Sequence, residues 1–293
     1  MTSRDLRNAT SVLVAAAALL LHLGAAAQGL PDTLGRIRTA GQVNVAYSPD
    51  SLPFSSHDAA GKPTGYSIDL CTRIVAAVGR AVGNANLRVN WMPGTVAERL
   101  AAIKAGRADL ECANTTATVS RMADVDFSSL VFVDSGGFLV RADGPIQSID
   151  GLAGKRVGVI AGTTTEQRLR GMLRERNIAA TTVVPVREAP EGPAMLAAGT
   201  IDAFAGDKIK LVGLLVTAPN PASLALLLAD LSYEPYAFAL PRGDSSLRLV
   251  VNRELTRIYV SGEIDRIFSE SLGRLGRPSG LLEAMFLLNA IPD

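Results

Sequence analysis

The stretch Ala-Ile-Lys-Ala-Gly-Arg-Ala-Asp at residues 102–109 has a counterpart in Leu-Ala-Ala-Gly-Thr-Ile-Asp at residues 196–202. In both stretches a helical pattern stops at a glycine, Gly106 or Gly199, and an apolar run that predicts a buried strand follows. Glycine is favoured there because the residue that ends a helix often takes a left-handed backbone conformation. Two copies in opposite halves of the chain predict two lobes of similar architecture.

Helical and strand patterns alternate on either side of these stretches. Predicted helices cover residues 34–40, 68–82, 99–106 and 195–199, and predicted strands cover residues 43–47, 87–92, 108–113, 155–160 and 201–205. This alternation with short connections is typical of an α/β protein with mainly parallel sheets. In such sheets ligands bind beside the loops that leave the carboxyl ends of the strands.

The first residues have the pattern of a secretion signal. Arg4 and Arg7 precede an uncharged apolar run over residues 11–24, which ends in the alanines 25–27. The run is shorter than the ~20 residues that a membrane span needs. We therefore predict a signal peptide at residues 1–27, cleaved after its last alanine, and a periplasmic mature protein. A retained N-terminal anchor is the alternative.

The charge balance excludes several classes of partner. The chain has 29 basic and 28 acidic residues, and residues 1–27 hold two arginines and one aspartate, so the mature chain has 27 of each. A neutral chain of this kind does not suit a polyanion, and we expect no nucleic-acid partner. The sequence has no phosphate-binding motif and no metal-ligand spacing, so we expect no cofactor and no metal.

Cys71 and Cys112 are the only cysteines of the chain. In an oxidising compartment an even number of cysteines favours a disulfide, which here would enclose about 40 residues. We predict that the two are bridged, and two separate buried thiols remain the alternative.

A loop with polar side chains follows the predicted strand at residues 108–113. It contains Asn114, Thr115 and Thr116, and Arg121 comes shortly afterwards. An arginine guanidinium binds a carboxylate through two parallel hydrogen bonds, and hydroxyl groups can occupy the remaining lone pairs. These residues predict a site for a carboxylate, with Arg121 at its centre.

Two further loops leave strand ends in the second half of the chain. Thr163 and Thr164 begin a predicted helix, whose free amide groups could bind the same anion, although Thr163 with Glu166 also reads as an ordinary capping box. Asp207 ends a predicted strand and could pair with an ammonium group, or it could simply cap the next helix. Phe54 is a candidate to cover the apolar side of a ligand, or it is a core residue.

Seven short motifs follow one another over nearly the whole mature chain. They are Leu-Pro-Phe (52–54), Gly-Lys-Pro-Thr-Gly-Tyr-Ser-Ile-Asp-Leu (61–70), Ala-Gly-Arg-Ala-Asp-Leu (105–110), Thr-Val-Ser-Arg (118–121), Val-Asp-Phe-Ser (125–128), Leu-Ala-Gly-Lys-Arg-Val-Gly-Val (152–159) and Gly-Thr-Thr-Thr-Glu (162–166). In this order they resemble the polar amino-acid-binding proteins of ABC importers, known as solute-binding protein family 3.

The resemblance implies a two-lobed fold of the periplasmic-binding-protein type II class, with a mainly parallel sheet in each lobe and a hinge of two crossings, near residues 133–137 and 233–237. Lobe 1 would comprise residues 28–134 and 236–293, and lobe 2 residues 135–235. A monomer would close its lobes over the ligand and deliver it to a membrane ABC permease complex.

The resemblance also implies roles for residues in the cleft. Arg121 would bind the α-carboxylate, with help from Thr116 and from the amide of Thr163 or Thr164. Asp207 would bind the α-ammonium group.

Within the family the chain resembles the glutamate- and aspartate-binding members through Leu-Glu-Cys-Ala-Asn-Thr-Thr (110–116) and Arg99. Those relatives use further basic residues for the side-chain carboxylate of the ligand. One of them corresponds to Ser48 here, which we keep as a candidate ligand-binding residue. A histidine that they carry has no counterpart in residues 185–193. Arg99 is then the expected partner of the side chain, and glutamate or aspartate is the expected ligand.

Two other functions remain open. The same fold hosts dehydratases that act on prephenate or arogenate, but the mature chain has a single histidine, His57, in a turn-rich loop, and no nucleophile motif. A liganded receptor could also act as a sensor that contacts a signalling partner in place of a permease. We expect a binding protein and not an enzyme.

Overall fold

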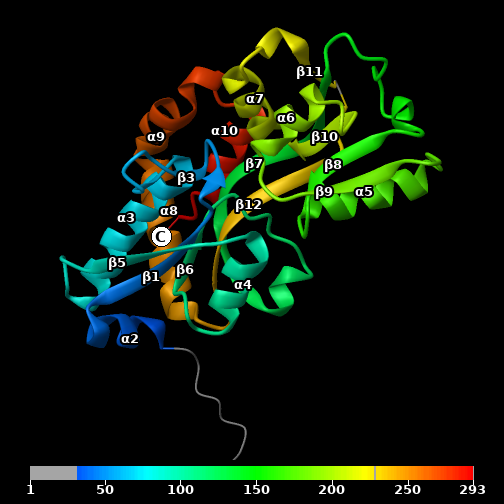
Figure 1. Cartoon of the computed structure of the whole chain (residues 1–293). Coiled ribbons are helices and arrows are strands. Elements are labelled where there is room, and N and C mark those ends of the chain that lie inside the picture. The colour runs from blue at the N-terminus through cyan, green and yellow to red at the C-terminus, as the bar shows by residue number, and fades with distance from the viewer. Residues whose placement is uncertain (1–31, 228, 293) are drawn as a thin grey trace, which may run out of the picture. The chain divides into compact units, whose positions relative to one another are not determined.

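The computed structural model describes residues 32–227 and 229–292, and the predicted signal peptide lies outside the described residues (Figure 1). The strands are β1 (Gln42–Tyr47), β2 (Asp50–Ser51), β3 (Ser55–His57), β4 (Pro63–Thr64), β5 (Arg88–Pro93), β6 (Leu110–Cys112), β7 (Val125–Arg141), β8 (Arg156–Ile160), β9 (Thr182–Val186), β10 (Ala203–Asp207), β11 (Leu224–Leu226) and β12 (Ser232–Pro241). The α-helices are α2 (Thr33–Ala40), α3 (Tyr66–Val82), α4 (Val96–Lys104), α5 (Thr164–Glu175), α6 (Glu191–Ala197), α7 (Lys208–Thr217), α8 (Ser245–Val260), α9 (Glu263–Leu272) and α10 (Gly280–Asn289). Among the described residues, every helix is too short or too polar to cross a bilayer.

Most of the strands belong to one mixed sheet. Its order is β5-β1-β6-β12-β7-β10-β8-β9, and β11 pairs with β7 outside this path. β1 pairs in parallel with β5 and β6, and β8 pairs in parallel with β9 and β10. The two parallel sets are therefore separated by the antiparallel pair β7 and β12, and a short hairpin sheet of β2, β3 and β4 lies apart from them.

β7 and β12 pass through both parts of the sheet, side by side (Figure 1). Their pairing extends from Val125 opposite Pro241 to Gly136 opposite Ser232. The crossings predicted near residues 133–137 and 233–237 lie inside these strands, so each crossing is a continuous strand and not a loop. Two paired strands link the halves more stiffly than two separate linkers would.

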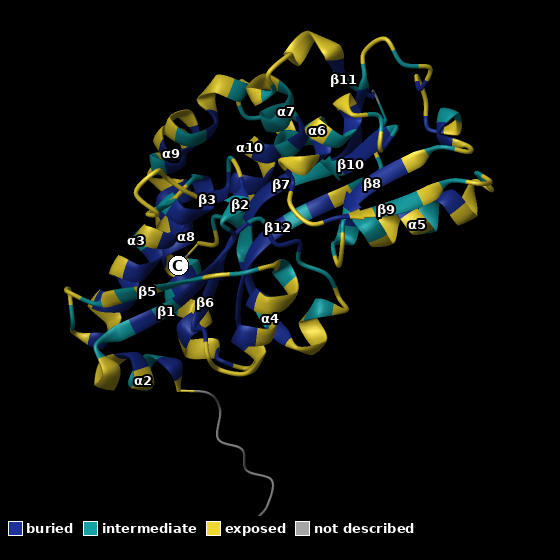
Figure 2. Ribbon diagram, in the orientation of Figure 1, coloured by how far each residue is buried: buried dark blue, intermediate teal, exposed yellow. Residues whose placement is uncertain are grey.

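The buried apolar side chains gather in clusters on either side of this strand pair. The buried members of two clusters come from residues up to Val133 and from Tyr236 onwards, whereas those of the other two lie between Phe138 and Leu227. Figure 2 shows the central strands buried, the edge strands β5 and β9 partly exposed, and the helices exposing their outer faces. We keep the proposed boundaries as a working definition, in which lobe 1 is the described part of residues 28–134 and 236–293 and lobe 2 is the described part of residues 135–235.

The duplicated motif has the same local structure in both lobes. Gly106 and Gly199 have φ of 67° and 66°, in the left-handed region that favours glycine. Asp109 accepts a hydrogen bond from the amide of Asn44 at 2.7 Å, and Asp202 accepts one from the amide of Arg156 at 2.9 Å. In each lobe the aspartate thus ties the start of the strand that follows the helix, β6 or β10, to a neighbouring strand.

Helix α4 begins three residues earlier than the sequence pattern predicted. Thr95 accepts a hydrogen bond from the amide of Glu98, and the Glu98 side chain accepts one from the amide of Thr95, which completes a capping box. The Thr-x-x-Glu pattern at residues 95–98 is the sequence signal for this earlier start. At α5 the predicted box is only half formed, because Glu166 accepts from the amide of Gly162 instead of that of Thr163.

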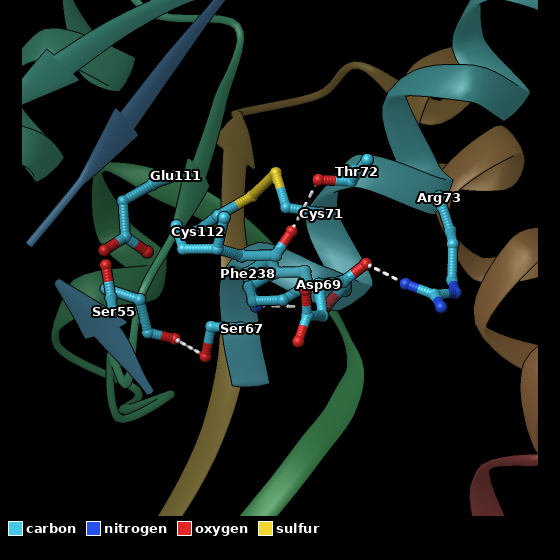
Figure 3. The surroundings of a disulfide bond; sticks show 12 residues. Ser55, Ser67, Asp69, Cys71, Thr72, Arg73, Glu111, Cys112 and Phe238 are labelled. Atoms are coloured by element: carbon cyan, nitrogen blue, oxygen red, sulfur yellow. Dashed lines mark hydrogen bonds between the residues drawn. A yellow bond between two sulfur atoms is a disulfide. The ribbon is translucent and has the colours of Figure 1, made fainter. Parts of the chain in front are cut away.

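The predicted disulfide is present between Cys71 in α3 and Cys112 in β6 (Figure 3). Both side chains are fully buried. The bond fastens α3 to the strand that leads directly into the polar loop at Asn114, Thr115 and Thr116. It therefore holds in place one wall of the site described next.

Candidate functional site

A cavity of about 530 Å³ lies where the carboxyl ends of the parallel strands meet. Residues that follow β1, β6, β8, β9 and β10 all line it, so both lobes contribute. Of the predicted site residues, the lining includes Ser48, Arg99, Asn114, Thr115, Thr116, Arg121, Thr163, Thr164 and Asp207. A cavity of this size suits a small organic molecule.

Arg121 begins a short 3-10 helix, Arg121–Ala123, after the β6 loop. Its Nη1 donates to the carbonyl oxygen of Thr116 at 2.8 Å, which turns the half-buried guanidinium toward the cavity. Burial lowers the pKa of Arg121 from its ordinary value, and the charges of Glu111 and Glu234 oppose that shift. Within residues 32–227 and 229–292, no carboxylate forms an ion pair with Arg121, so donors remain for an anion.

Asp207 is the last residue of β10 and precedes α7, but its side chain does not cap that helix. Its two carboxylate oxygens accept from Asn114 Nδ2 at 3.0 Å and from Thr165 Oγ1 at 3.1 Å. A carboxylate offers about four lone-pair positions, so Asp207 can accept further hydrogen bonds from a ligand. The helix-cap alternative therefore does not hold, and the contact with Asn114 joins the two lobes.

Glu234 is a buried carboxylate that sequence analysis missed. Its Oε2 accepts from Thr116 Oγ1 at 2.5 Å and from Thr164 Oγ1 at 2.9 Å, and its Oε1 accepts from Ser232 Oγ at 2.6 Å. With their hydrogens directed at Glu234, Thr116 and Thr164 present only lone pairs to the cavity. To donate to a ligand carboxylate, they would first have to leave Glu234.

Arg99 lines the cavity, but its charge is already neutralised. Its Nε lies 2.7 Å from Glu111 Oε1, and the two side chains are 6% and 0% exposed. Its other nitrogens donate to the carbonyl oxygen of Gly94 at 2.7 Å and to Thr115 Oγ1 at 3.3 Å. Thr115 in turn donates to Glu111, so these residues form a closed buried network.

Phe54 does not line the cavity. Its ring is fully buried and packs edge-on against Tyr66, Phe132 and Tyr236, with centroid distances of 6.0, 4.9 and 5.3 Å. The core alternative for Phe54 therefore describes this structure. Ser48 does line the cavity, and its hydroxyl donates to Asp50 at 2.8 Å and lies 2.8 Å from Ser51 Oγ.

Lys210 and Arg187 also line the cavity and were missed by sequence analysis. Arg187 follows β9 and is exposed, whereas Lys210 is half-buried in the first turn of α7. The carboxyl-end rule could have indicated Arg187 because it follows a strand directly. Lys210 lies inside a predicted helix, where a lysine has no distinguishing signal.

Asp134 lies on β7 beside this site. Its oxygens accept from the amides of Ser135 at 2.8 Å and Ile209 at 3.1 Å. Burial raises the pKa of Asp134 to about 7, and the neighbouring charge of Asp207 acts in the same direction. The carboxyl group of Asp134, whose pKa the charge of Asp207 helps to raise, thus titrates near neutral pH. Among the described residues, no cluster of three or more histidine, cysteine or acidic side chains could hold a metal ion.

Comparison with known proteins identifies the family to which this fold belongs. A model of the bacterial extracellular solute-binding proteins, family 3, matches residues 43–274. The L-glutamate/L-aspartate-binding protein of Pseudomonas aeruginosa is 31% identical over 278 residues, covering 94% of this chain and 92% of that protein. The glutamate/aspartate import solute-binding protein of Escherichia coli is 28% identical over 263 residues, covering 89% and 87%.

A solved structure of an ancestral arginine-binding protein bound to glutamine superimposes with a TM-score of 0.70 at 27% identity, covering 80% of this chain and 98% of that one. Fold and cavity together define a two-lobed ligand-binding protein of the periplasmic-binding-protein type II class. The chain belongs to the bacterial extracellular solute-binding proteins, family 3.

Proposed function

We propose that this chain is the periplasmic substrate-binding component of an amino-acid ABC importer. The observation that carries the proposal is that Arg121 and Asp207 line one cavity from different lobes. A cation without an ion pair and a carboxylate with free lone pairs match the two charged groups that every α-amino acid carries. The names of the relatives support the same class of ligand.

In the proposed complex the α-carboxylate of the ligand binds Arg121 and the amide groups at the start of α5. The α-ammonium group binds Asp207, and the Asn114 side chain offers it a carbonyl oxygen. Because the two charged groups are held by different lobes, binding would draw the lobes together, and a permease would recognise the closed form.

The preferred ligands are glutamate and aspartate. Two relatives, each aligned over most of the chain, are named for these amino acids. Arg99 lines the cavity as the resemblance implied, but its pairing with Glu111 leaves the recognition of the ligand side chain to another residue.

A thermal-shift screen of the purified protein against the twenty common amino acids tests the proposal, because a molecule that binds only the folded state raises the melting temperature. Glutamate and aspartate should give the largest increases. A rise with other polar amino acids alone would reject the preferred ligand and keep the class. No rise with any amino acid would reject the class, and turnover of prephenate should then be assayed.

Uptake of the ligand by cells with and without the gene distinguishes import from sensing. An importer component should be needed for uptake at low ligand concentration, and unchanged uptake would argue for a sensor.

A further inference from the structure

Lys210 is, like Arg121, a half-buried cation of the site that has no counter-ion among the described residues, whereas Arg99 is paired with Glu111. The Nζ of Lys210 lies 3.4 Å from Ser51 Oγ, across the cavity in lobe 1. No carboxylate of residues 32–227 or 229–292 forms an ion pair with it. By contrast Lys208, two residues earlier on the same helix, is paired with Asp230.

The surroundings of Lys210 on α7 leave its charge without a direct partner. The first turn of a helix carries partial positive charge, which disfavours cations, and the carboxylates of Asp207 and Asp134 at the start of α7 offset only part of it. A half-buried ammonium group also loses part of its hydration. An anion bound in the cavity would relieve both penalties.

Spacing along the chain places Lys210 beside the proposed ammonium site. Asp207 precedes α7 and Lys210 follows it by three residues, and side chains three apart at a helix are neighbours, about 5–6 Å between their Cβ atoms. They present a negative and a positive charge side by side. An acidic amino acid carries the complementary pair, an ammonium group and a side-chain carboxylate a few bonds away.

We propose that Lys210 binds the side-chain carboxylate of an acidic amino acid and so determines the specificity of the cavity. This inference rests on the proposed function. It assigns to Lys210 the role that the sequence suggested for Arg99, whose guanidinium is occupied by Glu111. The hydroxyl of Ser51 lies beside Nζ and would orient the ammonium group of Lys210.

Arg187 is the competing cation. It lines the same cavity but is exposed, and solvent screens its charge more strongly than that of Lys210. Its removal should therefore weaken an acidic ligand less.

Calorimetric titration with glutamate, aspartate, glutamine and asparagine tests the assignment. Lys210→Met, which keeps most of the length of the side chain and removes its charge, should weaken the binding of glutamate and aspartate at least tenfold. The affinity for glutamine or asparagine, where either binds, should change by no more than about twofold, because only glutamate and aspartate lose a charge pair. Lys210→Arg should restore most of the loss.

Lys208→Met is the matched control, since Lys208 lies on the same helix outside the cavity lining, and it should leave all affinities near those of the wild type. Equal weakening of acids and amides by Lys210→Met, or no weakening, would overturn the assignment while leaving amino-acid binding intact. So would a selective loss for acids in Arg187→Met alone. If wild-type protein binds only neutral amino acids, the Lys210 assignment fails but the proposed function stands; if it binds none, both fail.

Discussion

At the residue scale, Arg121 and Asp207 are distinguished by what they do not do. Arg121 pairs with no carboxylate among the described residues, and Asp207 does not cap the helix that it precedes. Both were predicted from the rule that ligands bind at the carboxyl ends of parallel strands, which needs only the local sequence. Glu111 and Glu234 were not, because their partners Arg99 and Thr116 lie 12 and 118 residues away, and such pairings leave no local pattern.

Replacing Arg121 by alanine should abolish amino-acid binding. The change removes a charge-assisted contact from a half-buried site, which we expect to cost several kcal/mol, roughly 2 to 5. Calorimetry measures the affinity, and the melting temperature without ligand checks that the fold is intact. Arg88→Ala, at an exposed residue of β5, is the control. Wild-type affinity in Arg121→Ala would show that Arg121 does not bind the ligand.

Asp207→Asn should discriminate between ligands by their ammonium group. The amide cannot pair with a cation, so the parent amino acid should lose at least tenfold in affinity, a change that corresponds to about 1.4 kcal/mol. The deaminated analogue, glutarate for glutamate, should change much less where it binds measurably. Comparable losses for both compounds in competition titrations would argue against ammonium binding at Asp207.

At the element scale, apolar periodicity located helices α2, α3, α4 and α6 and the parallel strands β1, β5, β6, β8 and β10. It gave no prediction for β7, β9 and β12 or for the C-terminal helices α8, α9 and α10. The apolar residues that recur at helical spacing on α3, Leu70, Ile74, Val75 and Val78, are all buried. The sequence predicted where the two crossings lie, but not that they are strands. Asp134, Ser135, Gly136 and Gly137 read locally as a turn, and only pairing with a strand from the far end of the chain makes them part of β7.

The disulfide links two elements, α3 and β6, and should stabilise lobe 1. In the loop-entropy model a bridge that spans 41 residues contributes about 3 to 4 kcal/mol, so Cys71→Ser combined with Cys112→Ser should lower the unfolding free energy by that amount. Urea denaturation of both proteins measures the difference. Two titratable thiols in denatured, unreduced wild-type protein would contradict the bridge.

At the scale of the whole molecule, Asp134 makes stability depend on pH. Its pKa is about 7 in the folded protein against an ordinary 3.8, so the folded state binds more protons than the unfolded state between these values. Stability supplied by the neutral form is complete below pH 4 and is lost as the pH rises to about 7. The contribution over this range is roughly 4 kcal/mol.

Asp134→Asn should therefore flatten the fall of unfolding free energy between pH 4 and 7, measured by urea denaturation at several pH values. The slope is the relevant quantity, because the amide also loses one acceptor for the amides of Ser135 and Ile209. Asp143→Asn, at an exposed turn, should leave the slope unchanged. A wild-type slope in Asp134→Asn would assign the pH dependence to other groups.

The double crossing also fixes the order in which the chain can be completed during synthesis. Lobe 2 is one uninterrupted stretch, whereas the core of lobe 1 joins Ile37 to Phe286, and the amide of Thr33 donates to Asp244, 211 residues later. Lobe 2 can thus close as soon as it is made, but lobe 1 must wait for the last helices. Until then the amino-terminal strands and helices can pair with one another, but their core lacks the side chains of α8, α9 and α10. If the predicted signal peptide directs export, lobe 1 is still incomplete when the chain reaches the membrane, and Cys71 and Cys112 can meet an oxidant before the core closes around them.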